Sequence, residues 1–465
     1  MGIYYDVIIV GAGPAGIFAA LEMTKHGIDK ILMLEKGKRV EKRTCPVGKD
    51  TLSCIECKPC SIMCGWGGAG AFSDGKLTLT TDFGGWLHNY IGREHLEKLI
   101  TYADDIYVSY GAPDRVFGRD SDLVKDLELK ASFAGLRLVP AVIRHMGTEN
   151  TLKVLNSMYL DLQEKVTIKT SETVTEIIVK NKQIKGVQTD KAVYKAPVVI
   201  LAPGRDGAEW FSEQAQKLNI PLKNNQVDLG VRVEVPAVTM KEFTDNIWEP
   251  KIFLNTKEFD DTVRTFCVNP NGFVVMENTN GIITVNGHAY ADKKSANTNF
   301  ALLLSQEFTA PFDKPILYGR SIAGLANMLS KGIIVQRYGD LKRGRRSTDS
   351  RIERGLVTPT LQGAVPGDLS LVLPHRYMVG IKECLEALDK IMPGVASDHT
   401  LLYGIEAKFY SARPELDNSL QTYIKGLWAI GDGAGVTRGL IQASASGIIA
   451  ARSVSQLFKT DSKVD

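Results

Sequence analysis

The sequence predicts an α/β protein built around a parallel β-sheet, and three observations carry this prediction. Residues Tyr4 to Gly11 form an apolar run, residues Pro14 to His26 place apolar side chains at helical spacing, and residues Lys30 to Leu34 form a second apolar strand. This β-α-β order fits within about 30 residues. Its first turn reads Gly11-Ala-Gly-Pro-Ala-Gly16, which is typical of a Rossmann-type dinucleotide-binding unit.

The GxGxxG pattern is a weak signal by itself, because the segment Gly65 to Gly70 also satisfies it. That segment follows no predicted strand, whereas the glycines at Gly11 lie between a strand and a helix. There they allow a tight turn and bring backbone N–H groups close to a pyrophosphate at the helix N-terminus. Glu35 ends the second strand and would accept the adenosine ribose hydroxyls while repelling a 2′-phosphate. The competing interpretation is a structural unit without a ligand.

A second signature lies near the C-terminus. The segment Trp428-Ala-Ile-Gly431-Asp432 resembles the strand-Gly-Asp segment by which glutathione-reductase-like flavoproteins contact the ribityl chain and the pyrophosphate. The resemblance implies FAD, with Asp432 as the contact, although the carboxylate could instead cap a helix. A helix is expected to begin near Leu440 and Ile441 and to aim its positive end at the flavin. Arg438 either adds a full charge there or lies at a solvated helix end.

The segment from Gly65 to Lys76 reads GWGGAGAFSDGK. Together with pieces beginning at Arg264, Pro366, Leu402 and Ile430, it resembles a large group of uncharacterised microbial FAD-dependent dehydrogenases along nearly the whole chain. The resemblance implies a fold and an FAD, but it supplies no substrate. The glycines would free this loop to lie against the flavin or the pyrophosphate, and a merely structural turn is the alternative. The expected cofactor contacts are Gly11, Gly13, Pro14, Ala15, Gly16, Glu35, Lys36, Gly68, Gly70, Ser73, Lys76, Val174, Gly204, Gly431, Asp432, Leu440 and Ile441.

Five of the seven cysteines fall between Cys45 and Cys64. Cys54, Cys57, Cys60 and Cys64 have nearly the spacing of a bacterial ferredoxin cluster loop, but Gly65 stands where proline usually follows. Either Cys64 or Cys45 would supply the fourth ligand. An iron–sulfur cluster, a tetrahedral zinc, a redox dithiol and packed structural thiols all remain open.

The domain organisation expected from these segments is discontinuous. Residues 1–206 form the first part of a Rossmann-type FAD-binding domain, with a β-meander hairpin and a Cys- and Gly-rich loop at 40–85. Residues 207–395 form an inserted α+β lobe for substrate binding, in which strand-like runs and Asn-Gly turns mix with helices. Residues 396–465 return to the FAD-binding domain.

The function expected is an FAD-dependent oxidoreductase that moves a hydride or electrons between flavin and an organic substrate, with a cysteine relay as an option. No general acid or base is assigned, and the catalytic candidates are Lys76, Cys267, His288 and Arg438. NAD(P)H or ferredoxin would be the electron partner. A flavin-dependent RNA-modifying enzyme and an electron-transfer subunit that docks a redox partner are the alternatives.

Composition limits the partners. A formal charge of +3 on 465 residues gives no broad field for nucleic acid, so no nucleic-acid partner is expected. No apolar run reaches the roughly 18 residues of a membrane span, and the first apolar stretch has no basic leader. A cytoplasmic protein without a membrane partner is therefore expected, as a monomer or a homo-oligomer.

Overall fold

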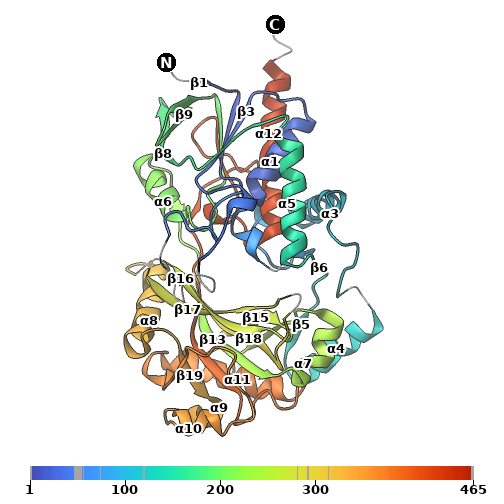
Figure 1. Ribbon diagram of the computed structural model, residues 1–465, viewed down its shortest axis with the longest axis vertical. Coiled ribbons are helices and arrows are strands. Elements are labelled where there is room, and N and C mark those ends of the chain that lie inside the picture. Colours follow the sequence, from blue (N-terminus) through green and yellow to red (C-terminus); the bar gives the residue numbers. More distant parts are fainter. Residues whose placement is uncertain are drawn as a thin grey trace. The chain divides into compact units, whose positions relative to one another are not determined.

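The computed structural model describes residues 3–46, 55, 57–73, 75–118, 121–279, 281–290, 293–312 and 314–461. The chain divides into two compact units, each with its own sheet and core (Figure 1). Unit 1 comprises Met1–Arg115, Arg144–Asn225 and Ser411–Asp465, and unit 2 comprises Val116–Ile143 and Gln226–Tyr410.

These limits differ from the expected ones in three places. Residues 207–225, expected in the inserted lobe, belong to unit 1. Val116–Ile143 belongs to unit 2, because strand β5 (Arg137–Val139) pairs with β14 (Lys251–Asn255) of that unit's sheet. Residues 396–410 also belong to unit 2, because β21 (Leu401–Lys408) pairs with a strand on each side there. Local sequence patterns indicate the type of an element, but they do not indicate which sheet it joins.

The central sheet of unit 1 is parallel and has the strand order β23-β11-β2-β3-β7. Its inner strands are continuous apolar runs that are buried on both faces, as expected for a sheet covered by helices. Because the strands are parallel, their carboxyl ends lie at one edge, and Gly11, Glu35, Ala202 and Ile430 all follow or end strands there. The bounds are β2 (Val7–Val10), β3 (Ile31–Glu35), β7 (Thr167–Thr170), β11 (Val198–Leu201) and β23 (Leu427–Ala429).

Two helices far apart in the sequence pack closely beside this sheet. Helix α1 (Pro14–Lys25) follows β2, and α12 (Leu440–Asp461) is the last helix (Figure 1). A Cβ atom at Gly447 of α12 would lie 2.2 Å from the carbonyl oxygen of Ala15 and 2.8 Å from the nitrogen of Ala19. Only glycine therefore permits this close approach of α12. The contact holds α1, the helix that follows the first glycine motif, in position.

The other elements of unit 1 complete its cover. The predicted β-meander forms a separate sheet in the order β1-β10-β9-β8, with its tight turn at Asn181 and Lys182, both at positive φ. The bounds are β1 (Ile3–Tyr4), β4 (Lys76–Thr78), β6 (Ile143–His145), β8 (Val174–Lys180), β9 (Gln183–Thr189), β10 (Val193–Lys195), β12 (Leu222–Lys223), β22 (Arg413–Pro414), α2 (His88–Ile91), α3 (Arg93–Ser109), α5 (Thr148–Leu162) and α6 (Ala208–Lys217).

Unit 2 is built on a mixed sheet in the order β20-β19-β21-β13-β18-β15-β14-β5. One face packs against helices in an apolar core, and the hairpin of β16 and β17 forms a separate sheet. The bounds are β13 (Val227–Pro236), β15 (Thr262–Asn269), β16 (Phe273–Thr279), β17 (Ile282–His288), β18 (Asn297–Gln306), β19 (Ile334–Arg337), β20 (Val365–Pro366), α4 (Asp122–Phe133), α7 (Ala237–Ile247), α8 (Pro315–Ser330), α9 (Tyr338–Lys342), α10 (Asp349–Glu353) and α11 (His375–Asp389).

Among the described residues, no helix combines the length and the apolar character needed to cross a membrane.

The close contact of α1 with α12 leads to a stability prediction. We expect Gly447→Ala to destabilise the protein by about 1–3 kcal/mol, because the added methyl group has no space against the backbone of α1. Thermal unfolding followed by circular dichroism measures the effect. The matched control is Gly324→Ala in α8, where the nearest atom to the new Cβ lies at 3.8 Å, so helix propensity should raise or preserve stability. Equal effects of the two substitutions would contradict the packing argument.

Candidate functional site

The first glycine motif forms a tight turn at the carboxyl edge of the sheet in unit 1. Gly11 has a φ of +106°, and a Cβ there would lie 2.1 Å from the carbonyl oxygen of Ala202. A Cβ at Gly16 would lie 2.0 Å from the carbonyl oxygen of Gly11. At Gly13, by contrast, a Cβ would meet only the Cα of Gly68, at 3.9 Å. Two glycines thus close the turn, and the third leaves space in front of it.

Helix α1 begins at this space without a side-chain cap. Gly13 is the N-cap residue and Pro14 is the first helical residue, so the cap position itself, within the described part of the chain, supplies no side-chain hydrogen bond to the first turn. The first turn of a helix carries N–H groups without intrahelical partners and the positive end of the helix dipole. The arrangement at Gly13, Ala15 and Gly16 is therefore suited to bind a pyrophosphate.

The second glycine segment lies directly on the first. The Gly67 N–H donates to the Ala12 carbonyl oxygen at 2.8 Å, and a Cβ at Gly68 would lie 3.2 Å from the Cα of Gly13. Further along, a Cβ at Gly70 would lie 2.4 Å from Cδ2 of Leu440. We call the turn at Gly11–Gly16 and the space in front of Gly13 the cradle. The second glycine segment therefore connects the cradle with the first turn of α12.

Glu35 holds these segments together. Its carboxylate is 7% exposed and accepts three backbone hydrogen bonds. Oε2 accepts from Ala12 at 3.0 Å, and Oε1 accepts from Gly37 at 2.7 Å and from Gly65 at 2.9 Å. Because a carboxylate offers about four lone-pair positions, Oε2 retains the capacity to accept one ribose hydroxyl.

Lys36 takes part in a different contact from the one expected. Its ammonium group forms an ion pair with Asp206, which follows β11. Burial acts to raise the pKa of Asp206, but the hydrogen bond and the charge of Lys36, together with the hydrogen bond from Cys64, lower that pKa below its usual value. The Cys64 thiol donates to the same carboxylate at 3.1 Å, and burial raises the pKa of this thiol. Lys36 and Cys64 thus serve to hold Asp206, a residue that the sequence did not single out.

The cysteine segment is organised around Arg43. This buried guanidinium donates to the carbonyl oxygens of Ser61 at 2.9 Å, Ile62 at 2.7 Å and Trp66 at 2.7 Å. Burial lowers the pKa of Arg43 to about 10. The sequence gives no signal for this role, because a single arginine after a loop is usually solvated.

The predicted metal ligands do not converge in the part of the chain that the structure describes. Cys54 lies outside the described residues. Among the described residues, no group of three or more His, Cys, Asp or Glu side chains is placed to share a metal ion. Cys45, Cys57, Cys60 and Cys64 are all free thiols.

Asp432 lies at the turn after β23, as the second signature predicts. Its Oδ1 accepts from the Thr437 hydroxyl at 2.6 Å and from the Gly439 N–H at 3.3 Å, whereas Oδ2 has no partner among the described residues. Burial raises the pKa of Asp432, and the hydrogen bond from Thr437 opposes that shift. The carboxylate is thus oriented by its own loop and presents one oxygen to a ligand hydroxyl.

Arg438 stacks on an aromatic ring before α12 begins. Its guanidinium carbon lies 3.9 Å from the ring centroid of Trp86, and that of Arg413 lies 5.1 Å from the same ring. The backbone N–H of Trp86 donates to the Val436 carbonyl oxygen at 3.0 Å. Sequence reasoning missed Trp86 and Arg413; the paired glycines before Trp86, both at positive φ, were the available signal of a close backbone approach.

The remaining predicted contacts are dispersed over unit 1. The Ser73 hydroxyl donates to the Gly70 carbonyl oxygen at 2.8 Å and so stabilises its own turn. Lys76 begins β4, and Val174 is buried at the start of β8. A Cβ at Gly204 would meet no atom within 4 Å, and Ile441 is buried beside Leu440 in α12.

The two other catalytic candidates belong to unit 2. Cys267 lies in a bulge of β15 at a φ of +47°, and its N–H donates to Glu249 Oε1 at 2.9 Å. His288 ends β17, with its ring 4.4 Å from that of Tyr290.

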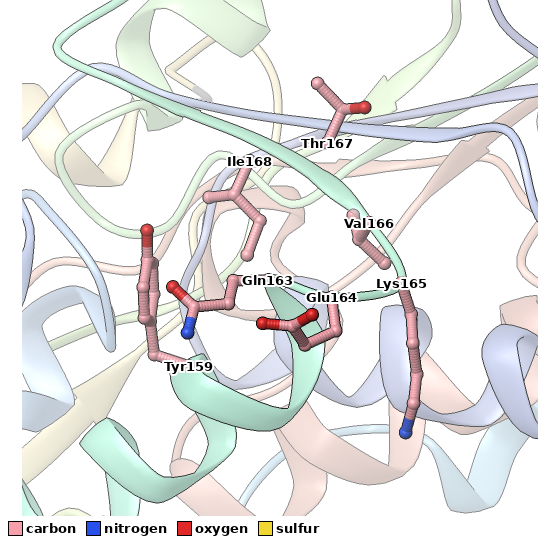
Figure 2. Close-up of a pocket in the computed structure, with 7 residues that line it drawn as sticks. All are labelled: Tyr159, Gln163, Glu164, Lys165, Val166, Thr167 and Ile168. Atoms are coloured by element: carbon pink, nitrogen blue, oxygen red, sulfur yellow. The ribbon is translucent and has the colours of Figure 1, made fainter.

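A pocket of about 450 Å³ in unit 1 does not belong to this site. It is lined by Tyr159 and by residues 163–168, which join the end of α5 to the start of β7 (Figure 2). Figure 2 shows the ammonium group of Lys165 pointing away from Gln163 and Glu164. The start of a parallel strand lies at the edge opposite to its carboxyl end, where the cradle is.

Comparison with known families identifies the cofactor. Residues 4–52 match the family described as "FAD binding domain", and residues 227–409 match "FAD-dependent protein, C-terminal domain-like". The second match coincides with the main segment of unit 2. An uncharacterised protein of Clostridium beijerinckii is 27% identical over 472 residues, which cover 97% of this chain and 81% of that protein.

Solved structures show weaker likenesses. L-proline dehydrogenase from P. horikoshii has a TM-score of 0.42 and 12% identity, covering 98% of this chain and 94% of that one. Glycine oxidase from Bacillus cereus has a TM-score of 0.38 and 12% identity, covering 97% and 95%. Values this low carry no argument about activity.

The uncapped α1, the acceptor positions on Glu35 and Asp432, and the glycine-lined space between them fit FAD. With the two matched FAD families, they indicate that the chain binds FAD.

Proposed function

We propose that unit 1 binds FAD along its carboxyl edge and that the enzyme passes a hydride or electrons between the flavin and a small organic substrate. The pyrophosphate would lie at the first turn of α1, a ribose hydroxyl on Glu35, and a ribityl hydroxyl on Asp432. The observation that supports this most is the cradle itself. Three glycines shape it, no side chain caps it, and oriented carboxylates stand at its two ends.

FAD supplies the redox chemistry when it is bound, and the residues of this chain orient it and adjust its environment. The N-terminus of α12 and the guanidinium of Arg438 favour negative charge nearby, which stabilises the reduced and anionic form of the cofactor. The stacking of Arg438 on the Trp86 ring, which Arg413 also contacts, holds that charge in place. Lys76, Cys267 and His288 stay candidates for proton transfer.

Glu35 gives the sharpest test of the cofactor site. Glu35→Gln replaces one acceptor oxygen by an NH₂ group, which faces backbone N–H donors and cannot accept from them. We expect the dissociation constant for FAD to rise by at least about tenfold, since hydrogen bonds to a charged group contribute roughly 1.5–3 kcal/mol. Flavin absorbance during titration of the deflavinated protein measures this constant.

The matched control for that titration is Glu41→Gln. Glu41 is exposed and, among the described residues, forms an ion pair with Arg39 at 2.7 Å, so its loss should leave FAD affinity unchanged. If Glu35→Gln binds FAD as tightly as the wild type, or if the wild type binds none, the proposed cofactor site is incorrect.

The electron donor can be identified with the bound flavin as reporter. NADH, NADPH and reduced ferredoxin are each mixed anaerobically with the FAD-loaded protein, and bleaching of the flavin absorbance is followed. Rapid bleaching by one donor assigns it. Bleaching by none, with salt-sensitive binding of tRNA, would favour the RNA-modifying alternative.

The cysteine segment leads to a separate prediction. The Cys64 thiol donates to Asp206, and burial raises its pKa, so we expect a metal bound by this segment to take its fourth thiolate from Cys45. We expect Cys64→Ser to retain any iron or zinc of the wild type and Cys45→Ser to lose it. Iron, sulfide and zinc analysis of anaerobically purified protein measures this. Metal loss in Cys64→Ser alone would contradict the assignment, and a metal-free wild type would leave only thiol chemistry.

A further inference from the structure

One face of the sheet in unit 2 carries buried charges. Along β13 the residues Val227 to Val235 alternate, so that Val231 and Val233 pack in the apolar core. Asp228, Arg232 and Glu234 point to the other face, and all three are fully buried. Buried charges are tolerated only when they are paired and hydrogen-bonded. A buried charged group whose hydrogen-bonding atoms all have partners within the unit has a structural role. A buried charged group with an unpartnered atom is a candidate for binding a ligand.

Arg232 is satisfied completely by this unit. Its Nε and Nη2 donate to the two carboxylate oxygens of Glu406 at 2.9 and 3.0 Å. Its Nη1 donates to Asn299 Oδ1 at 2.9 Å and to the Cys267 carbonyl oxygen at 3.1 Å. Every nitrogen of this guanidinium has a partner, as a structural arginine requires.

Arg264, on β15 of the same sheet, is different. Its Nη2 donates to Asp228 Oδ2 at 2.5 Å, with the Tyr410 hydroxyl at 3.4 Å. Its Nη1 is buried and has no hydrogen-bond partner in the part of the chain that the structure describes. The side chain is 12% exposed. A buried donor without a partner costs about 1–3 kcal/mol, so its presence calls for an acceptor other than the described residues of the unit.

Asp228 cannot supply that acceptor. Its Oδ1 accepts from the Ser305 hydroxyl at 2.6 Å and from Gln226 Nε2 at 3.3 Å. Its Oδ2 accepts from Arg264 and from the Tyr410 hydroxyl. All of its lone-pair positions are therefore occupied. Asp228 fixes the guanidinium in one orientation and leaves Nη1 unsatisfied.

The surroundings of Arg264 define the ligand further. Lys408 stands across from Asp228 in the sheet and pairs with Glu406 at 2.9 Å. The three cations Arg232, Arg264 and Lys408 are balanced on this face by the carboxylates of Asp228, Glu234 and Glu406, so the ligand is defined by the unsatisfied Nη1 donor of Arg264 and not by excess charge. The Phe266 ring, 5.5 Å from the guanidinium carbon of Arg264, adds an apolar surface. One unsatisfied guanidinium donor beside an aromatic ring suits an organic acid with a single carboxylate.

We propose that unit 2 carries a carboxylate-binding site at Arg264 and that the organic substrate of this enzyme is a monocarboxylic acid. The inference rests on the proposed function for its second half, because it takes the ligand of unit 2 to be the substrate. A carboxylate oxygen accepts from Nη1, and its partner oxygen reaches the rest of the guanidinium fork. The carbon chain of the acid lies against Phe266.

The test uses the FAD-loaded protein and a set of probe pairs. Each pair is a monocarboxylate and its amide, from acetate and acetamide to benzoate and benzamide, and binding is measured by calorimetry. We expect some acids to bind the wild type and their amides to bind at least about tenfold more weakly. Arg264→Lys keeps the positive charge beside Asp228 but removes the fork, so it should weaken acid binding by about tenfold or more.

Two controls make the result decisive. Arg354→Lys alters an exposed arginine that follows α10 and donates from Nε to the Ser350 carbonyl oxygen at 2.9 Å, and it should leave acid binding unchanged. Flavin absorbance and the midpoint of thermal unfolding show whether each variant keeps its cofactor and its fold. A wild type that binds acids no better than amides, or an Arg264→Lys variant with unchanged affinity, overturns the proposal. Because bound flavin is recorded separately, that outcome leaves the proposed FAD site intact, and loss of flavin from the wild type would reject the proposed function instead.

Discussion

The carboxylate of Glu35 is the interaction on which the cofactor side of this protein depends. It joins three stretches of backbone that are distant in sequence: the turn after β2, the residues after β3, and the start of the second glycine segment. Each N–H would be an unsatisfied buried donor without it. A single negative charge at the end of a strand therefore shapes the cradle and also presents an acceptor to a ligand.

The sequence was sufficient for the parts of the fold with a strong local signal. The β2-α1-β3 unit, the hairpin at Asn181 and helix α12 lie within a few residues of their expected limits, because apolar period and turn residues determine them. The pairing of β5 and β21 with unit 2 could not be read in this way, since strand pairing depends on contacts between distant residues. For the same reason, the sequence did not predict that Val116–Ile143 belongs to unit 2.

Within the site, residues that act through the backbone were predictable and those that act through side-chain pairing were not. The glycine motifs follow from turn geometry, whereas Asp432 was indicated by the resemblance of its segment to flavoproteins. The pairing of Lys36 with Asp206, the hold of Arg43 on three carbonyl groups, and the stacking of Trp86 depend on segments that meet only in the folded chain. The contrast between Arg232 and Arg264 is of the same kind, because two arginines of identical chemistry differ only in how completely their neighbours satisfy them.

The discontinuity of unit 1 has a consequence for how the chain is made. Unit 2 has all of its residues once Tyr410 has been synthesised, and it can then fold as a unit on the ribosome. Unit 1 still lacks β23 and α12 at that moment, although its first strand was made hundreds of residues earlier. The side of α1 that contacts α12 therefore has no partner until Gly447 has been synthesised and packs against Ala15. The N-terminal glycine motif thus reaches its final packing only when the last helix of the chain has been made.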